Sequence, residues 1–204
     1  MMPKTILAEN IDYQEIIESL RSGGIIVYPT DTAYALGCDA TNKEAIGKIF
    51  KIKGRQENKT LPVIIGSLDM AKKWVCFSEQ EEELASRHWP GPLTLLLEPV
   101  ENSLPDVVVK EGRAALRVPD NKIAQELSLR LAAPLVSTSA NLAGSGNFYK
   151  INDVVQSLGP NLELVDYVID AGQLPERGVS TIARFDRDRM EVIRPGTVEL
   201  LINK

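Results

Sequence analysis

The sequence has little of what several protein classes require. It contains 2 Cys, Cys38 and Cys76, and a single His, His88, in 204 residues. Two cysteines exclude a disulfide scaffold, and without a CxxC pair nothing indicates a His/Cys zinc site. No apolar run approaches the roughly 18 residues that a membrane-spanning helix needs, and the N-terminus lacks the apolar region of a secretory signal. We therefore expect a cytoplasmic protein without membrane contact.

Standard catalytic and nucleotide-binding motifs are also missing. The chain has no GxxxxGK[ST] P-loop and no GxGxxG after a strand, nor a GxSxG nucleophile elbow. A Ser–His–Asp triad would depend on His88, which lies near a predicted helix end, so we interpret it as structural. Any chemistry must therefore come from side chains outside these motifs.

The composition is that of an ordinary globular protein, with 44% hydrophobic and 25% charged residues. Its length fits one domain over residues 1–204. A net charge of −5 and 5% aromatic residues exclude a uniformly basic, nucleic-acid-binding coat. One segment departs from this balance and is basic despite Glu57; its cations are Lys48, Lys51, Lys53, Arg55 and Lys59. Such a run indicates either a solvated helix end or a local anion site.

Strand-like and helix-like segments alternate along the chain. Apolar and β-branched runs predict strands at residues 4–8, 25–28, 61–65, 114–118, 135–139, 167–170, 180–185 and 191–194. Helical spacing predicts helices over 10–21 and 198–202, and further helices capped by Thr41, Ser67, Ser78 and Asp120. The alternation predicts an α/β fold with a mixed sheet, because the late run of strands disfavours a purely parallel one.

Polar clusters follow or flank several of these strands. The clusters are Thr30-Asp31-Thr32, Lys53-Gly54-Arg55, Arg117, Ser137-Thr138-Ser139-Ala140-Asn141, Ser180-Thr181 and Arg194-Pro195-Gly196. Each alone has a plainer interpretation as a turn, a helix cap or a surface ion pair. Because ligands bind at strand ends in α/β folds, the clusters together predict an anion-binding pocket on the sheet.

The blocks YPTDTAYALG, KGR, WPGPLTLLL, LRVPD, STSAN and RPG occur in this order. In this respect the chain resembles the YrdC-type threonylcarbamoyl-AMP synthases in their single-domain form. The resemblance implies an open, twisted α/β sheet with flanking helices and a large concave cavity. It also implies that ATP, L-threonine and bicarbonate react to give threonylcarbamoyl-AMP and pyrophosphate. A transferase complex would then modify adenosine at tRNA position 37.

The resemblance also assigns roles to individual residues. The family's KxR motif falls on Lys53 and Arg55, which would be catalytic and would bind ATP together with Arg117 and Arg194. Ser139 and Asn141, from the SxN motif, would hold the nucleotide, and Thr32 and Ser180 would bind threonine. Mg²⁺ is expected to arrive with ATP, bridging its phosphate oxygens without a dedicated protein site.

Five positions depart from the family pattern: Ala33, Ala35, Gln56, Thr60 and Ile64. Ala35 adds a side chain where the family has Gly, and Ile64 replaces a His that contacts threonine in many members. An alternative function is an RNA-binding factor for translation or ribosome maturation, contacting tRNA or double-stranded RNA without catalysis. A third is an enzyme that forms a carbamoyl-adenylate from another amine or another carbamoyl donor.

Overall fold

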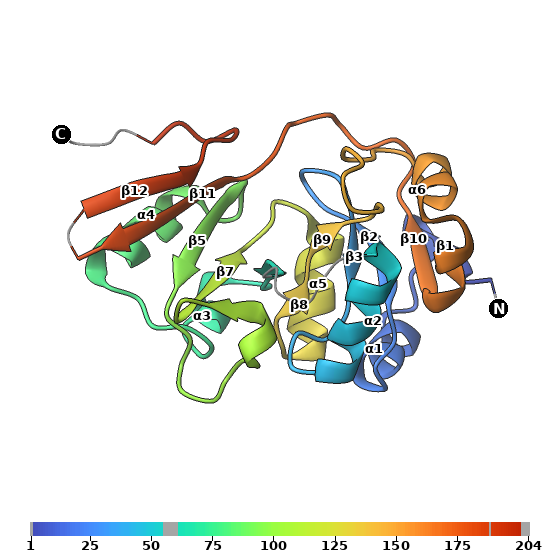
Figure 1. Cartoon of the computed structure of the whole chain (residues 1–204), viewed down its shortest axis with the longest axis horizontal. Helices are drawn as coiled ribbons and strands as arrows, with labels where there is room; N and C mark the ends of the chain where they lie inside the picture. Colours follow the sequence, from blue (N-terminus) through green and yellow to red (C-terminus); the bar gives the residue numbers. More distant parts are fainter. Residues whose placement is uncertain (1, 55–60, 188, 201–204) are drawn as a thin grey trace.

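The computed structural model describes residues 2–54, 61–187 and 189–200, and Figure 1 shows their arrangement. The helices are α1 (Tyr13–Arg21), α2 (Lys43–Lys53), α3 (Leu68–Ala71), α4 (Glu79–His88), α5 (Lys122–Leu131) and α6 (Ile151–Leu158). The strands are β1 (Lys4–Leu7), β2 (Ile26–Pro29), β3 (Tyr34–Gly37), β4 (Val63–Ile64), β5 (Leu93–Leu97), β6 (Val109–Lys110), β7 (Arg113–Arg117), β8 (Leu135–Val136), β9 (Thr138–Ser139), β10 (Tyr167–Asp170), β11 (Thr181–Asp186) and β12 (Arg189–Arg194). Short 3-10 segments are η1 (Ala8–Asn10), η2 (Asp106–Val108) and η3 (Gly159–Leu164).

The strands form two mixed sheets, which confirms the predicted α/β fold. The first has the order β1-β10-β2-β3-β9, parallel from β1 to β2 and antiparallel from β2 to β9. The second has the order β12-β11-β5-β7-β4-β8, with β6 paired to β7. Within it β11 runs parallel to β5 and β4 parallel to β7, whereas β5 and β7 are antiparallel.

The predicted strand at residues 135–139 is in fact shared between the two sheets. β8 pairs with β4 in the second sheet, and β9 pairs with β3 in the first. Ser137 lies between them, and its backbone N–H donates to the carbonyl of Pro62 at 2.9 Å. At Gly37 the packing is so close that a Cβ would lie 2.7 Å from the carbonyl oxygen of Val136. The chain therefore crosses from sheet to sheet at Ser137.

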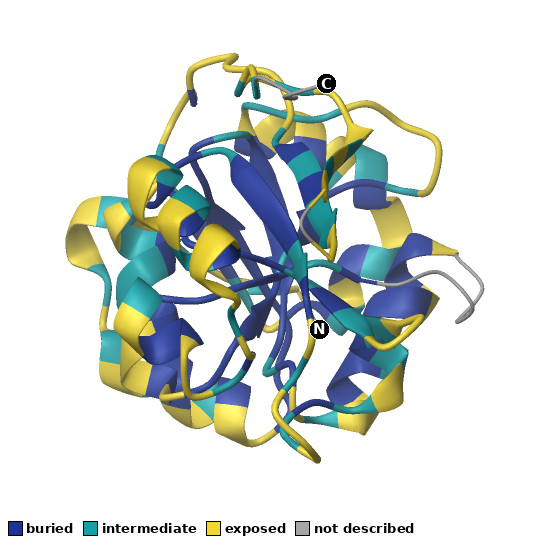
Figure 2. Cartoon of the chain, turned by 90° about the vertical axis from the view of Figure 1, so that its left-hand side faces the viewer, coloured by how far each residue is buried: buried dark blue, intermediate teal, exposed yellow. Residues whose placement is uncertain are grey.

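Helices cover the sheets and leave a buried centre, visible as dark strands in Figure 2. On the first sheet, Ile16 and Leu20 of α1 pack with Leu127 of α5 and Ile26 of β2. On the second sheet, α4 packs on β5 and contributes Ala85 to the larger core cluster. The first sheet is buried on both faces, since Val27 of β2 belongs to the larger core cluster and Ile26 to the smaller one.

Most predicted elements are present, but several helix starts were wrong by one to three residues. The helix predicted over 10–21 begins at Tyr13, because the Asp12 side chain accepts the N–H groups of Gln14 and Glu15. Asn42 caps α2 in place of Thr41, and Asn121 caps α5 in place of Asp120. In both cases neighbouring residues are good caps, and only the backbone decides which of them is used.

Of the other helix predictions, two caps were confirmed and one helix was wrong. Ser67 caps α3, and Ser78 forms a capping box on α4, both as predicted. The helix predicted over 198–202 is wrong for residues 198–200, which are not helical, and residues 201–202 lie outside the described part. The reason is local: the Thr181 hydroxyl bonds both the carbonyl and the N–H of Val198. Helix α6 was not predicted at all.

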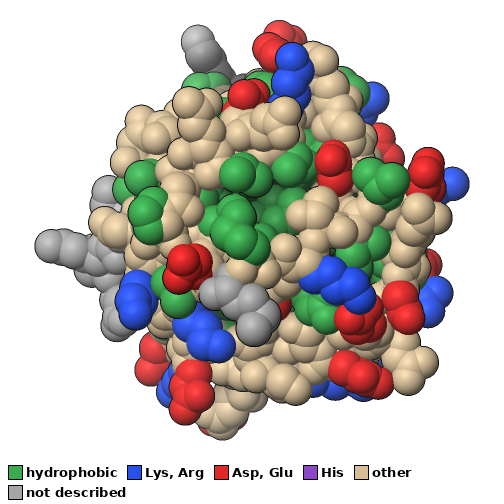
Figure 3. Space-filling model, turned by 90° about the vertical axis from the view of Figure 1, so that its right-hand side faces the viewer, with side chains coloured by type: hydrophobic (Ala, Val, Ile, Leu, Met, Phe, Trp, Pro, Cys, Tyr) green, Lys and Arg blue, Asp and Glu red, His purple; other side chains and the backbone are tan. Residues whose placement is uncertain are grey.

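Charges of both signs surround a group of hydrophobic side chains on the side of the molecule that carries β1 and α6 (Figure 3). On this side β1 forms the edge of the first sheet, with Leu7 52% exposed. Mixed charge of this kind is not the stripe of Lys and Arg that nucleic-acid surfaces display. None of the described helices is long and apolar enough to span a bilayer.

Candidate active site

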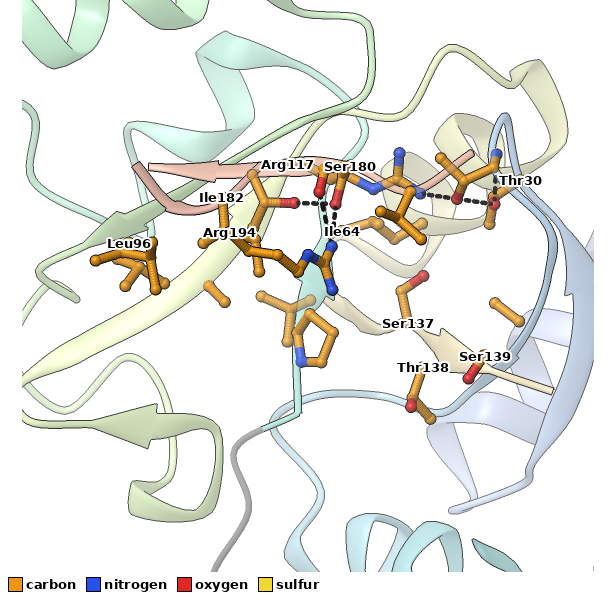
Figure 4. Close-up of a pocket in the computed structure, with 18 of the residues that line it drawn as sticks. Thr30, Ile64, Leu96, Arg117, Ser137, Thr138, Ser139, Ser180, Ile182 and Arg194 are labelled. Carbon is orange, nitrogen blue, oxygen red and sulfur yellow. Dashed lines mark hydrogen bonds between the residues drawn. The ribbon is translucent and has the colours of Figure 1, made fainter. Parts of the chain in front are cut away.

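A cavity of about 650 Å³ is lined by strands of both sheets (Figure 4). This size lies within the range of about 300–1,000 Å³ that is usual for small-molecule sites. The first sheet contributes Tyr34, Ala35 and Ser139, and the second contributes side chains from β4, β5, β7, β11 and β12. A ligand in the cavity would therefore contact both sheets at once.

On β7 and β5, alternate residues belong to the core and to the cavity wall. On β7, Ala114 and Leu116 belong to the buried core, whereas Arg113, Ala115 and Arg117 line the cavity. Strand β5 repeats the pattern in the same way: its odd-numbered leucines are in the core, and its even-numbered residues line the cavity. Because successive strand residues point to opposite faces, one face of the second sheet packs against helices and the other forms the cavity wall.

The turn between β2 and β3 positions Thr30, Asp31 and Thr32. Asp31 and Arg117 form a buried ion pair with 2.7 Å between Oδ1 and Nη1, and their side chains are only 2% and 8% exposed. The same guanidinium donates from Nη2 to the Thr32 hydroxyl at 3.0 Å. Asp31 Oδ2 is buried and has no hydrogen-bond partner among the described residues. Arg117 is thus held firmly, with its remaining N–H groups available at the cavity wall.

A second cation enters from β12. Arg194 Nη2 donates to the carbonyl oxygen of Ser180 at 2.7 Å and to its hydroxyl at 3.1 Å. Burial, followed by the positive charge of Arg117, lowers the pKa of Arg194 from its ordinary value. A Cβ on Gly196 would lie 2.5 Å from backbone atoms of Ser180 and Thr181. The glycine of the RPG motif therefore lets this turn approach β11 closely.

Lys53, Ser139 and Asn141 come together beside the cavity. The Lys53 ammonium donates to the carbonyl of Ser139 at 2.6 Å and to the side-chain oxygen of Asn141 at 2.7 Å. The Asn141 amide in turn donates to the carbonyls of Ser145 and Gly146. Of these residues only Ser139 lines the cavity. Lys53 and Asn141 are each 3% exposed and lie behind the wall, where they hold Ser139 in place. Together they order the segment that leads to Asn147, another lining residue.

The structure thus brings five of the predicted residues to the cavity wall: Thr32, Arg117, Ser139, Ser180 and Arg194. The predictions for Arg55, and the departures noted at Gln56 and Thr60, lie outside the described residues. Ala33, Ala35 and Ile64 line the cavity, so three of the departures from the family pattern lie at its wall.

Sequence reasoning missed several lining residues, including Thr94, Lys110, Arg113, Asn147 and Arg184. Arg113 could have been found, because it lies four residues before Arg117 on one strand and therefore on the same face. Lys110, Asn147 and Arg184 reach the wall from distant parts of the chain, and no local pattern indicates them.

The charge at the wall is predominantly positive. Lys110, Arg113, Arg117, Arg184 and Arg194 line the cavity, and Glu111 is the one carboxylate among its described lining residues. Of these cations, Arg117 and Arg184 have acidic partners within 3 Å. Among the described residues no group of three or more His, Cys, Asp or Glu is arranged to hold a metal ion. The wall therefore suits an anion and lacks the oxygen donors of a Mg²⁺ cage.

Comparison with known proteins places this geometry in a family. A model of the Sua5/YciO/YrdC family, described as "Telomere recombination", matches residues 18–196. The chain belongs to this family. A bovine family member named threonylcarbamoyl-AMP synthase is 34% identical over 184 residues, which are 88% of this chain and 66% of that protein.

Two solved Sua5/YciO/YrdC structures extend the comparison. P. abyssi Sua5 complexed with L-threonine superposes with a TM-score of 0.83 at 29% identity, over 96% of this chain and 58% of that one. E. coli YciO superposes with a TM-score of 0.81 at 28% identity, over 96% of each chain. The chain therefore spans under two thirds of the bovine and P. abyssi proteins and nearly all of YciO.

Proposed function

We propose that the chain is a threonylcarbamoyl-AMP synthase. L-Threonine, bicarbonate and ATP would give threonylcarbamoyl-AMP, pyrophosphate and water, for later transfer to adenosine at tRNA position 37 by a separate transferase complex. The observation that carries the proposal is the pair Arg117 and Arg194, two cations from different strands that converge on one cavity rich in hydroxyl groups. The threonine complex of P. abyssi Sua5 supports the choice of amino acid.

The chemistry suits this wall. The threonine amine captures CO₂ as a carbamate, whose oxygen attacks the α-phosphorus of ATP while pyrophosphate leaves, so no protein nucleophile is required. Fixed cations stabilise the phosphate charge as it redistributes in the transition state. Arg117 is preorganised by Asp31 and Thr32, and Arg194 by Ser180. A carbamate is labile in water, so a cavity between two sheets would also protect it by limiting the access of water.

Each predicted residue has a role in this proposal. Thr32 and Ser180 would bind threonine, and Ser139 and Asn141 the nucleotide. Lys53 and Arg55 would complete the cationic set around the phosphates. The hydrogen bonds of Lys53 to the Ser139–Asn141 segment support a role in shaping that wall. Mg²⁺ would enter on the ATP phosphates, since the described wall offers it no set of carboxylates.

The decisive experiment is direct. The protein is incubated with ATP, labelled bicarbonate and each amino acid in turn, and the products are analysed by mass spectrometry. We expect a labelled carbamoyl-adenylate with L-threonine. A label incorporated with another amine instead would identify an enzyme with a different substrate, and no adenylate with any amine would refute the proposal.

The RNA-binding alternative is less well supported. The protein carries a net charge of −5, and the described cavity wall presents hydroxyls and one aromatic residue, Tyr34, in place of a stacking platform. A salt titration separates the two functions. RNA binding as the main activity requires an affinity that falls steeply with salt and does not respond to threonine.

A further inference from the structure

A β-bulge lies where β12 reaches the cavity. Val192 pairs with Ala183, whereas Arg194, two residues further on, pairs with Ile182, the very next residue of β11. Ile193 is thus one residue more than regular pairing uses. Ile193 and Arg194 both line the cavity, although successive residues of a regular strand point to opposite faces. The bulge therefore brings Arg194 to the wall, in the way that bulges beside active sites re-aim a side chain.

The bulge also interrupts the regular pairing that would hold Arg194 in place. The next residue, Pro195, has no N–H with which to continue the ladder. The guanidinium itself is bound through Nη2 to the carbonyl and the hydroxyl of Ser180 (Figure 4). Burial, and after it the like charge of Arg117, lowers the pKa of Arg194. Both effects oppose a guanidinium at this place, so its position depends on how firmly the end of β12 is fixed against Ser180.

Thr181 supplies an anchor for the chain beyond the bulge. The residue is 1% exposed, and its hydroxyl donates to the carbonyl of Val198 at 2.7 Å and accepts the N–H of Val198 at 3.0 Å. One side chain thus satisfies both polar backbone groups of Val198. The backbone N–H of Thr181 donates to the carbonyl of Pro92 at 2.9 Å, so the anchor is itself part of the second sheet.

Thr197 binds the same two segments together one residue earlier. Its N–H donates to the carbonyl of Val179 at 3.0 Å. Its hydroxyl lies 2.9 Å from the carbonyls of Arg177 and Val179 and donates its one proton to either of them. The hydroxyls of Thr181 and Thr197 form what we call the clamp. The clamp joins residues 197–198 to residues 177–181, which include Ser180.

We propose that Thr181 is a positioning residue for Arg194. By anchoring Val198 it holds the end of β12 against β11, and with it the guanidinium at the cavity wall; Thr197 supports it in this role. The inference rests on the proposed function, in which Arg194 stabilises charge on the phosphates of ATP. Thr181 is not among the described residues that line the cavity, so it acts on the reaction only through its neighbours.

Thr181→Val tests the anchor, because valine keeps the shape of threonine and removes only the hydroxyl. The backbone groups of Val198 then lose both bonds, and the chain after Arg194 is free to move. A misplacement of about 1 Å at an active site can cost about a hundredfold in rate. We expect kcat/KM for threonine-dependent adenylate formation to fall by about tenfold or more. Thr181→Ser keeps the hydroxyl and should restore the activity.

The same substitution in an Arg194→Ala protein separates positioning from general support. If Thr181 acts through Arg194, removing the guanidinium also removes what the anchor holds. Thr181→Val should then lower kcat/KM by roughly twofold or less in the Arg194→Ala background, because the two substitutions are not additive. An independent effect would give the same factor in both backgrounds.

Ser128→Ala is the matched control for loss of a buried hydroxyl. Ser128 is fully buried in α5 and donates to the carbonyl of Ala133 at 3.0 Å. Its replacement should lower Tm and leave kcat/KM unchanged. Thr197→Val, at an exposed position, serves if Thr181→Val does not fold, and its effect should show the same dependence on Arg194. Circular dichroism and Tm establish the folding of each variant.

Near-normal kcat/KM in folded Thr181→Val would overturn the inference, and so would an equal loss with and without Arg194. Failure of the proposed function has a different signature, because the natural protein then forms no labelled adenylate with L-threonine. In that case the affinity for ATP, measured by calorimetry in the same set of proteins, takes the place of kcat/KM. Loss of ATP affinity in Thr181→Val only when Arg194 is present would still support the anchor, and any other pattern would overturn it.

Discussion

Replacing Asp31 by Asn tests whether the ion pair beneath the cavity stabilises the fold. Asp31 and Arg117 are 2.7 Å apart, and their side chains are 2% and 8% exposed. At an effective dielectric constant of about 20, the Coulomb attraction over this distance is about 6 kcal/mol. Most of it offsets the desolvation of the two charges, but removing one partner leaves the other buried and uncompensated. That typically costs about 3–5 kcal/mol.

Asp31→Asn keeps the shape of the side chain and one acceptor for Arg117. It also places an N–H₂ group at Oδ2, which has no partner among the described residues, so a buried donor is left unsatisfied. We expect the free energy of unfolding, measured by urea denaturation, to fall by about 3 kcal/mol or more.

Glu126→Gln is the matched control for this substitution. It removes an ion pair with Arg130 at 2.8 Å whose side chains are 43% and 55% exposed, and it should cost about 0.5 kcal/mol or less. The reasoning is refuted if both variants lose a similar amount, because burial would then not decide the strength of the pair. The reasoning is also refuted if Asp31→Asn lowers the free energy of unfolding by less than about 1 kcal/mol, the range of an exposed ion pair.

Three further predictions follow from the site and its surroundings. Lys53→Ala should abolish adenylate formation in the mass-spectrometric assay, because its ammonium orders the Ser139–Asn141 segment of the cavity wall. Ser139→Ala and Asn141→Ala should weaken ATP binding more than L-threonine binding in calorimetry, with the larger loss for Asn141, which makes more bonds. Glu15→Gln should make the free energy of unfolding depend less on pH in acid. Hydrogen bonds, first that from Lys4, lower the pKa of Glu15 below its ordinary value of 4.5. The stability that Glu15 contributes is therefore present above pH 4.5 and is lost as the pH falls through the lowered pKa.

Each of these has an outcome that contradicts it. Near-normal turnover in folded Lys53→Ala would remove this residue from the site. Equal losses for ATP and L-threonine would reject the division of roles between the SxN segment and Thr32. An unchanged acid limb in Glu15→Gln, followed by urea denaturation at several pH values, would show that the Lys4 bond does not persist in solution.

Local sequence patterns predicted most of the strands, because their signal is local, but β3, β5 and β6 were not predicted. Buried runs such as β2, and the alternation on β7, depend on residues close together in the chain. Helix caps were less certain where two suitable residues adjoin, as at Thr41 and Asn42. Ser78 and Glu81 form the predicted capping box, but the same spacing at Thr41 and Glu44 does not, so the spacing alone does not decide which residue caps a helix.

The shape of the site was harder to predict for a different reason. A continuous run at 135–139 gives no sign that its two halves pair in different sheets, because partner choice depends on β3 and β4 far away in sequence. The same holds for Lys110 and Arg184, which reach the cavity only after the second sheet is assembled. The family motifs indicated the main residues, but the depth of Lys53 and Asn141 beneath the wall required coordinates.

The crossing at Ser137 has a consequence for cooperativity. Because β8 and β9 lie on either side of Ser137, the strand pairings of one sheet cannot open without disturbing those of the other. We therefore expect the backbone amides of Val136 and Thr138 to exchange with deuterium only through global opening. A small molecule that bridges the two sheets would then slow the exchange of these amides by a factor of one plus the ratio of its free concentration to its Kd.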